Sequence, residues 1–237
     1  QGAPARARDA PAAGPSAEAA APTMRPRRPP GSPWVESNAR HLPKPPAAAL
    51  DLACGRGRHA LLLLDLGYEV VAVDSDAAAL AALRQRAPDG ARARLSAVEH
   101  DVEAAARRGS PWPPEVAGRR FAAVLVVNYL HRPLLPLLLD LLEPGGVLIY
   151  EAWASGNEAH AAPKDARVLE ERVLRPNELL QLALPRCEVL GFSHGPLEDY
   201  EGRDCVKQML CARLPPLAPS AARPGGGPAA AAGGGGA

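Results

Sequence analysis

The sequence predicts an α/β fold: a seven-stranded, mostly parallel sheet with helices on both faces and an antiparallel hairpin at its C-terminal end. Three observations support this. Short apolar runs alternate with helical patterns, which is typical of a parallel sheet covered by helices. The run at 121–130 is continuously apolar, as expected of a strand covered on both faces. The runs at 187–194 and 204–214 have only a polar turn between them, so they are expected to pair antiparallel.

The first unit is the stretch 50–60, LDLACGRGRHA, followed by an amphipathic helix that ends at Gly67. It combines an apolar strand, a glycine turn at Gly55 and Gly57, and a helix N-terminus. Exposed backbone N–H groups without a Cβ in the way allow a polar ligand to approach closely. This stretch is therefore the first candidate for a ligand site.

The remaining elements follow in alternation. The predicted strands are rich in β-branched and other apolar residues and lie at 68–76, 93–101, 121–130, 147–153, 187–194 and 204–214. The predicted helices are rich in Ala and Leu or begin with Pro, and lie at 77–87, 133–146 (closed by Pro-Gly-Gly) and 176–183. Residues 154–173 are expected to be loop with some helix.

Low-complexity tails flank this domain. Residues 1–33 are rich in Ala, Pro and Arg, and residues 214–237 in Ala, Gly and Pro. Neither can bury enough apolar surface to offset the entropy of ordering, so we predict disordered tails around a folded domain at 34–213. Since the chain starts at Gln1, it is either a fragment or is translated from Met24. The Arg-rich first tail also allows a targeting peptide, although its prolines would break the amphipathic helix.

The composition excludes some classes of protein. A net charge of +1 gives no general affinity for nucleic acid or membrane surfaces, and no apolar run is long enough to span a bilayer. The four cysteines have no CxxC or zinc-type spacing, which favours free thiols and a reduced, cytoplasmic setting. No metal-ligand cluster is expected.

Asp51 distinguishes two kinds of nucleotide ligand. The spacing Gly55-x-Gly57-x-x-Ala60 would also suit a dinucleotide. However, a carboxylate at the strand end repels a pyrophosphate and attracts an ammonium group. The ligand is therefore expected to carry an amine and no phosphate, which fits S-adenosylmethionine (SAM) better than NAD.

Acidic residues follow the first three strands. Asp51, Asp74 and Asp101 each close one of them, at the sheet edge where ligands of such folds bind. Asp74 and Asp101 could also be helix N-caps, for which Asp is favoured.

The motifs DLACGRGRHA, VVAVDSD, EHDVE, VVNYLHRPLLP, LEPGGVLIYEAWASGNE, RPNELL and QMLCARL occur in this order. With these motifs the sequence resembles the class I SAM-dependent methyltransferases, a family with a Rossmann-like sheet. Within that family it is most similar to the small type 11/12 and tellurite-resistance-like members. The likeness covers about residues 33–213. The resemblance favours a small-molecule acceptor. The segment after Asn157 departs from the family pattern, so the identity of that acceptor stays open.

The resemblance implies a role for each candidate residue. Asp51 and the backbone from Ala53 through Gly55 to Gly57 would hold the methionine part of SAM, and Asp74, with its neighbour Ser75, would hold the ribose. Asp101 would face the adenine amino group, and Val102 would pack on the ring. Asn128 and Tyr129 would line the sulfonium side. At Ala53 many relatives have glycine.

Tyr129 and His131 are the candidate catalytic residues. Alternation in an extended stretch would put them on one side and Asn128 on the other. We expect them to position or deprotonate the acceptor, while a surface His131 and a core Tyr129 remain alternatives. Two other functions stay open: a SAM-binding sensor or interaction protein without transferase activity, and an NAD(P)-dependent oxidoreductase.

Overall fold

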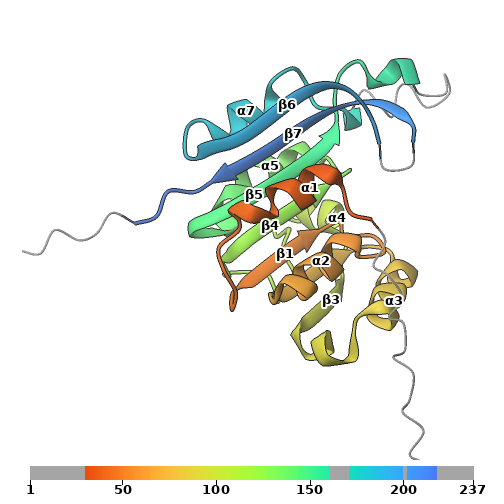
Figure 1. Ribbon diagram of the computed structural model, residues 1–237, viewed down its shortest axis with the longest axis vertical. Coiled ribbons are helices and arrows are strands. Elements are labelled where there is room, and N and C mark those ends of the chain that lie inside the picture. The colour runs from red at the N-terminus through yellow and green to blue at the C-terminus, as the bar shows by residue number, and fades with distance from the viewer. Residues whose placement is uncertain (1–29, 161–170, 200–201, 218–237) are drawn as a thin grey trace, which may run out of the picture.

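The computed structural model describes residues 30–160, 171–199 and 202–217. Its centre is one seven-stranded sheet with the order β3-β2-β1-β4-β5-β7-β6 (Figure 1). Strands β1 to β5 are parallel, and β7 runs antiparallel to both β5 and β6. The strands are β1 Ala48–Leu52, β2 Glu69–Asp74, β3 Leu95–Glu99, β4 Phe121–Val127, β5 Leu142–Trp153, β6 Glu188–Glu198 and β7 Asp204–Arg213. The predicted fold class is confirmed.

Helices cover both faces of the sheet (Figure 1). Helices α1 to α3 pack on one face, and α4, α5 and α7 pack on the other. They are α1 Pro33–Asn38, α2 Arg58–Leu66, α3 Ala77–Arg86, α4 Val102–Arg107, α5 Leu135–Leu138 and α7 Glu178–Ala183. Short 3-10 turns lie at η1 Ala39–His41, η2 Asp89–Arg94, η3 Arg132–Leu134, η4 Leu139–Leu141 and η5 Asn157–His160. Because both faces are covered, every residue of the central strand β4 is buried, as predicted.

Two predicted helices are shorter in the structure. The helix expected at 133–146 ends at Leu141, because Leu142 already pairs with Phe121 as the start of β5. At Gly146 a Cβ atom would come within 2.8 Å of the Phe121 carbonyl oxygen, so strand pairing rather than helix termination explains this glycine. The helix expected from residue 176 begins at Glu178, because Asn177 adopts a left-handed conformation.

Residues next to both predicted boundaries of the folded domain make contacts with it. Ser32 is buried, and its hydroxyl donates a hydrogen bond to the Glu151 carboxylate. The same hydroxyl accepts a hydrogen bond from the Trp34 N–H, so Ser32 is the N-cap of α1. At the other end, Leu214 extends the β5–β7 pairing through backbone hydrogen bonds with Gly145 and Gly146. Burial and hydrogen bonding therefore extend the ordered domain to both residues. The predicted disorder of residues 1–29 and 218–237 lies outside the described part of the chain.

Ser32→Ala should lower the thermal midpoint by roughly 3–12 °C, because a hydrogen bond to a buried carboxylate and an N-cap are lost together. The measurement is a thermal melt followed by circular dichroism. Ser37→Ala on the same helix is the matched control. Its hydroxyl donates to the Trp34 carbonyl oxygen and accepts a long bond of 3.4 Å from Asn38 Nδ2, with no buried charge involved, so its midpoint should shift by less than about 2 °C. Equal midpoints for the two variants would show that Ser32 belongs to the tail after all.

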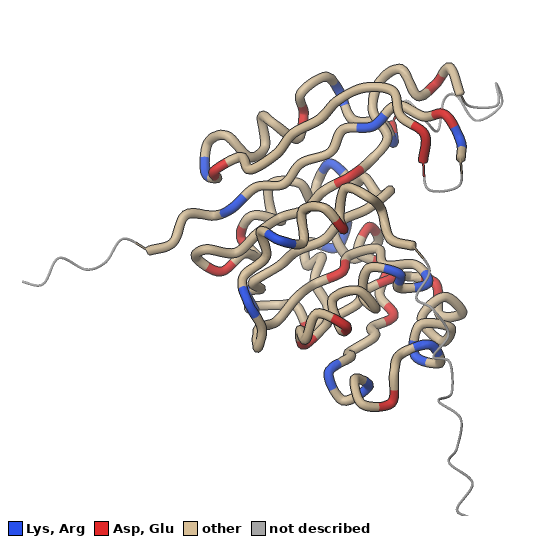
Figure 2. Tube along the Cα trace, in the orientation of Figure 1, with Lys and Arg blue, Asp and Glu red and all other residues tan. Residues whose placement is uncertain are grey.

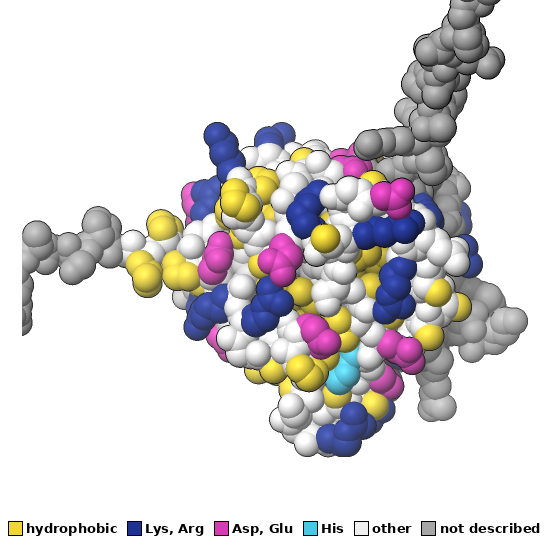
Figure 3. Space-filling view, turned by 90° about the horizontal axis from the view of Figure 1, so that it is seen from below, with side chains coloured by type: hydrophobic (Ala, Val, Ile, Leu, Met, Phe, Trp, Pro, Cys, Tyr) yellow, Lys and Arg dark blue, Asp and Glu magenta, His cyan; other side chains and the backbone are white. Residues whose placement is uncertain are grey.

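The distribution of charge on the surface and the state of the cysteines are as expected from the composition. Basic and acidic residues are interspersed along the chain, and the face seen from below carries both signs of charge (Figures 2 and 3). The four cysteines are buried and unpaired, as predicted. Within the described residues, no helix combines the length and the hydropathy that a membrane span requires.

Candidate functional site

The glycine turn between β1 and α2 leaves open space at one of its two glycines. Gly55 has φ +52° and a Cβ atom there would meet nothing within 4 Å, whereas its N–H donates to Asp74 Oδ2 at 2.6 Å. Gly57 has φ +72°, and a Cβ atom there would lie 2.4 Å from the Leu83 side chain. The first glycine therefore permits close approach of a ligand, while the second permits α2 to pack on α3.

Asp51 is a buried carboxyl group with an unused oxygen. Its exposed fraction is 1%, and Oδ2 has no hydrogen-bond partner among the described residues. Burial raises the pKa of Asp51 to about 7, although the backbone N–H of Ala60 and the positive charge of Arg58 lower it. An orphaned buried carboxylate oxygen is costly unless a ligand satisfies it, and a cation satisfies it best.

Asp74 and Asp101 both lie where the sequence predicts, at the carboxyl ends of neighbouring strands. Asp74 closes β2, and its two oxygens accept from the N–H groups of Gly55 and Asp76. Asp101 caps α4 by accepting from the Ala104 N–H at 2.9 Å, so the N-cap alternative is correct for this residue. That bond is the main reason the pKa of Asp101 is lowered. In α3 the N-cap is Asp76, not Asp74.

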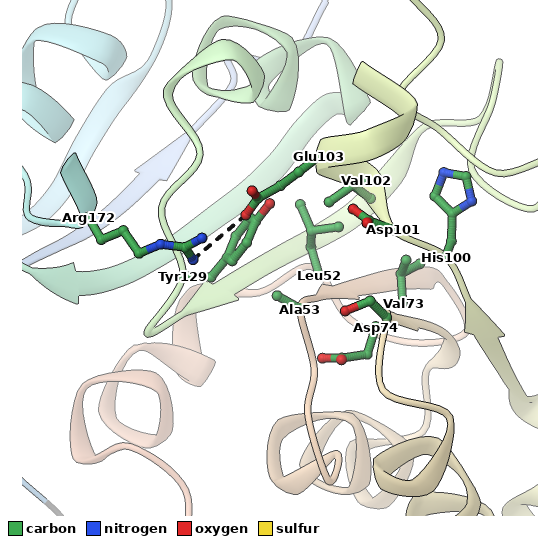
Figure 4. Close-up of a pocket in the computed structure, with 11 residues that line it drawn as sticks. Leu52, Ala53, Val73, Asp74, His100, Asp101, Val102, Glu103, Tyr129 and Arg172 are labelled. Carbon is green, nitrogen blue, oxygen red and sulfur yellow. Dashed lines mark ion pairs between the residues drawn. The ribbon is translucent and has the colours of Figure 1, made fainter. Parts of the chain in front are cut away.

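A pocket of about 380 Å³ opens beyond the carboxyl ends of β1, β2 and β4. Figure 4 shows Asp74 and Asp101 on one side of it, and Tyr129, Glu103 and Arg172 on the other. Six of the predicted residues line it: Ala53, Asp74, Ser75, Asp101, Val102 and Tyr129. Five do not reach its wall: Asp51, Gly55, Gly57, Asn128 and His131.

Glu103 is the centre of a charged cluster at the Tyr129 side of the pocket (Figure 4). Its carboxylate lies 3.8 Å from His131 Nδ1 and 3.8 Å from an Arg172 Nη atom. The Tyr129 hydroxyl is buried without a hydrogen-bond partner in the described residues. Burial, and then the charge of Glu103, raise the pKa of Tyr129, so the phenol stays protonated and can donate to a ligand.

Asn128 contacts Lys207 rather than the cluster around Glu103. Its side-chain Oδ1 accepts from Lys207 Nζ at 2.9 Å, and its N–H donates to the Glu151 carbonyl oxygen at 2.7 Å. The residue has φ +57°, in the left-handed region that Asn tolerates better than most residues. This conformation ends β4 and turns the chain toward Tyr129.

Sequence reasoning missed three charged residues here: Glu103, Arg172 and Lys207. Glu103 directly follows the Asp101-Val102 pair and stands in the first turn of α4, so its place beside the pocket could have been inferred. Arg172 is brought in by a segment that Arg132 holds through hydrogen bonds to the Glu171 and Val173 carbonyls. No local pattern reveals that contact. Among the described residues, no three His, Cys, Asp or Glu side chains form a group that could hold a metal ion.

Comparisons with known proteins identify a methyltransferase domain in one part of the chain. A family profile described as "Methyltransferase domain" matches residues 49–146, which include the glycine turn and Asp51, Asp74 and Asp101. This match covers less than half of the chain and shows that this segment has the sequence pattern of a methyltransferase domain. No curated protein sequence matches it significantly.

Solved structures share the fold of this chain at low sequence identity. TehB from Haemophilus influenzae is 20% identical with a TM-score of 0.56, over 76% of this chain and 61% of TehB. The glycopeptide N-methyltransferase MtfA, complexed with SAM, is 22% identical with a TM-score of 0.52, over 76% of this chain and 92% of its own. The cyclase SpnF is 16% identical with a TM-score of 0.56, over 77% of this chain and 80% of its own. This chain thus spans less than two thirds of TehB.

The pocket and the residues around it have features that suit SAM, the ligand of the MtfA structure named above. The unsatisfied oxygen of Asp51 suits the ammonium group, and the open space at Gly55 suits a ligand close to the backbone. Asp74 offers carboxylate oxygens toward a diol, and Val102 offers apolar surface toward a ring. The residues present therefore fit the cofactor.

Proposed function

We propose that this protein transfers a methyl group from SAM to a small-molecule acceptor. The observation that carries the proposal is the buried carboxyl group of Asp51, whose Oδ2 has no hydrogen-bond partner among the described residues and which directly precedes the pocket-lining residues Leu52 and Ala53. Such a group calls for a cationic ligand, and SAM carries both an ammonium and a sulfonium charge. The buried free thiols further support a reduced, cytoplasmic setting for the reaction.

Each end of the cofactor has residues to hold it. Asp51 and the backbone from Ala53 to Gly57 would bind the methionine part. Asp74 and Ser75 would bind the ribose hydroxyls, and Asp101 and Val102 the adenine. Asn128 and Tyr129, at the end of β4, would border the sulfonium. These assignments follow the family resemblance and agree with the pocket wall formed by Ala53, Asp74, Ser75, Asp101, Val102 and Tyr129.

Bound SAM supplies an activated methyl group that is open to direct displacement. The chain then has to align the acceptor and keep water out. Tyr129 can donate a hydrogen bond to the acceptor, since its phenol stays protonated. His131 can take a proton from the acceptor, and Glu103, 3.8 Å from Nδ1, stabilises the imidazolium that forms.

A second function is binding without methyl transfer. SpnF has a similar fold and is described as a cyclase, so this fold is not restricted to proteins described as methyltransferases. A NAD(P)-dependent oxidoreductase is less favoured, because Asp51 would face the pyrophosphate.

Isothermal titration calorimetry separates these functions. The protein should bind SAM and S-adenosylhomocysteine and give no heat with NADH. Product formation from radiolabelled SAM across a panel of amines, hydroxyl compounds, thiols and oxyanions then tests transfer. Binding without any product over a broad panel would favour the sensor, and binding of NADH alone would overturn the proposal.

SAM affinity should depend on pH through Asp51. In the free protein this carboxyl group is protonated below a pKa of about 7, and the ligand ammonium prefers its ionised form. Affinity should therefore be full above pH 7 and fall by about tenfold per pH unit below it. Calorimetry between pH 5.5 and 8.5 measures the effect.

Asp51→Asn is the matched control for that titration. The amide cannot ionise, so affinity should be weaker than wild type at high pH and nearly independent of pH. A wild-type affinity that does not change between pH 5.5 and 8.5 would show that Asp51 does not meet the ammonium group.

A further inference from the structure

A chain of buried polar groups links five elements of the described domain. Lys207 on β7 and Glu151 on β5 are 1% and 3% exposed, and their Nζ and Oε1 atoms lie 2.5 Å apart. Lys207 Nζ also donates to Asn128 Oδ1 at the end of β4. The Ser32 hydroxyl donates to the other oxygen of Glu151, and the Ser32 N–H donates to His59 Nε2 at 3.0 Å. His59 lies in the first turn of α2, directly after the glycine turn.

Stability does not explain a buried pair of this kind. Removing two charges from water costs free energy that their attraction only partly returns, and apolar replacements of similar size are often as stable. The apolar surroundings of β5 and β7 would accept such a replacement, since Ile149 and Cys211 on the same face are fully buried. The position of Lys207 suggests what the charge contributes instead.

Lys207 decides how the Asn128 amide is turned. A lysine ammonium has only donors, so Asn128 must present its oxygen to it and keep its Nδ2 donors for another partner. The same contact stabilises the left-handed backbone conformation of Asn128 at φ +57°, which is less favourable for a residue with a Cβ atom than the right-handed one. The next residue, Tyr129, lines the pocket, and its carbonyl oxygen accepts from the Tyr150 hydroxyl at 2.7 Å.

We propose that Lys207 is a positioning residue for the ligand site: through Asn128 it holds the end of β4 in the shape that directs Tyr129 into the pocket. The wider chain through Glu151, Ser32 and His59 connects the end of β4 to the first turn of α2, which directly follows the glycine turn. The inference rests on the proposed function, because it takes the pocket to be the cofactor site.

The test replaces the ion pair by uncharged side chains of similar size, Lys207→Met with Glu151→Gln. Gln can still hydrogen-bond Ser32, and no buried charge is left without a partner. The matched control is Arg213→Met with Glu188→Gln, which removes an ion pair of 3.1 Å between β7 and its other neighbour β6, at the opposite end of β7. Both are compared with wild type by thermal melting, by calorimetry with S-adenosylhomocysteine, and by NMR of the Asn128 side-chain amide and Tyr129 backbone signals.

The Lys207 variant should melt within a few degrees of wild type and bind S-adenosylhomocysteine about 3- to 30-fold more weakly. Its Asn128 and Tyr129 signals should shift, whereas the control should match wild type in affinity and in both signals. Should the Met variant not fold, Lys207→Leu with Glu151→Gln gives the same comparison. An affinity within about twofold of wild type in a folded variant would overturn the positioning role. Wild-type protein that fails to bind S-adenosylhomocysteine would instead overturn the proposed function.

Discussion

His131→Ala should lower turnover on the true acceptor by about 10²- to 10⁴-fold, because it removes the group that we propose takes the acceptor proton. The affinity for S-adenosylhomocysteine should stay within about threefold of wild type, since His131 does not line the pocket where the cofactor would lie. Steady-state kinetics with the acceptor found in the panel, together with calorimetry, measure the two quantities. A loss confined to turnover would place His131 in the chemistry rather than in cofactor binding.

Two further variants sharpen this prediction. His194→Ala on β6 replaces an exposed histidine away from the pocket and should leave turnover unchanged. Tyr129→Phe removes the unpartnered hydroxyl at the pocket wall and should lower turnover as well, through poorer alignment of the acceptor. Turnover of His131→Ala within about twofold of wild type would mean that His131 is a surface residue paired with Glu103.

Asp74→Ala should weaken SAM binding by about 10- to 150-fold, which is the change in affinity expected when a hydrogen bond to a charged group is lost. The variant loses the carboxylate that faces the pocket at the end of β2. It also loses the bond of 2.6 Å that holds the Gly55 N–H, so the glycine turn becomes less ordered. Calorimetry with SAM at pH 8, where Asp51 is ionised, measures the loss.

Asp76→Ala, two residues along the chain, separates binding from folding. Asp76 caps α3 through the Ala78 and Ala79 N–H groups, and its removal should cost about 0.5–2 kcal/mol of stability. Its SAM affinity should stay near that of wild type. If the two variants lose affinity equally, the effect of Asp74 reflects the local fold rather than contact with the cofactor.

Much of this protein follows from local patterns in its sequence. The alternation of apolar runs and helical segments predicts the sheet, because a parallel strand covered on both faces must be apolar throughout, as β4 is. The missing helix between the last two strands predicts the hairpin, because antiparallel strands need only a short turn. Asp51, Asp74 and Asp101 could be found because the carboxyl ends of parallel strands meet at one edge of the sheet.

What the sequence could not decide depends on contacts between distant segments. Leu142 begins β5 because Phe121 lies beside it, and this pairing overrides the helical pattern that precedes it. Ser32 belongs to the domain because Glu151, 119 positions away, accepts its hydrogen bond.

The cluster of Glu103, His131 and Arg172, and the contact between Lys207 and Asn128, likewise exist only after the sheet has formed. The local signals of secondary structure report which backbone conformation a segment prefers. These local signals carry no information on which charged side chains from distant segments will lie next to that segment. The sequence by itself therefore determined the fold, and only the tertiary structure decided how Glu103, His131 and Arg172 come together beside the pocket.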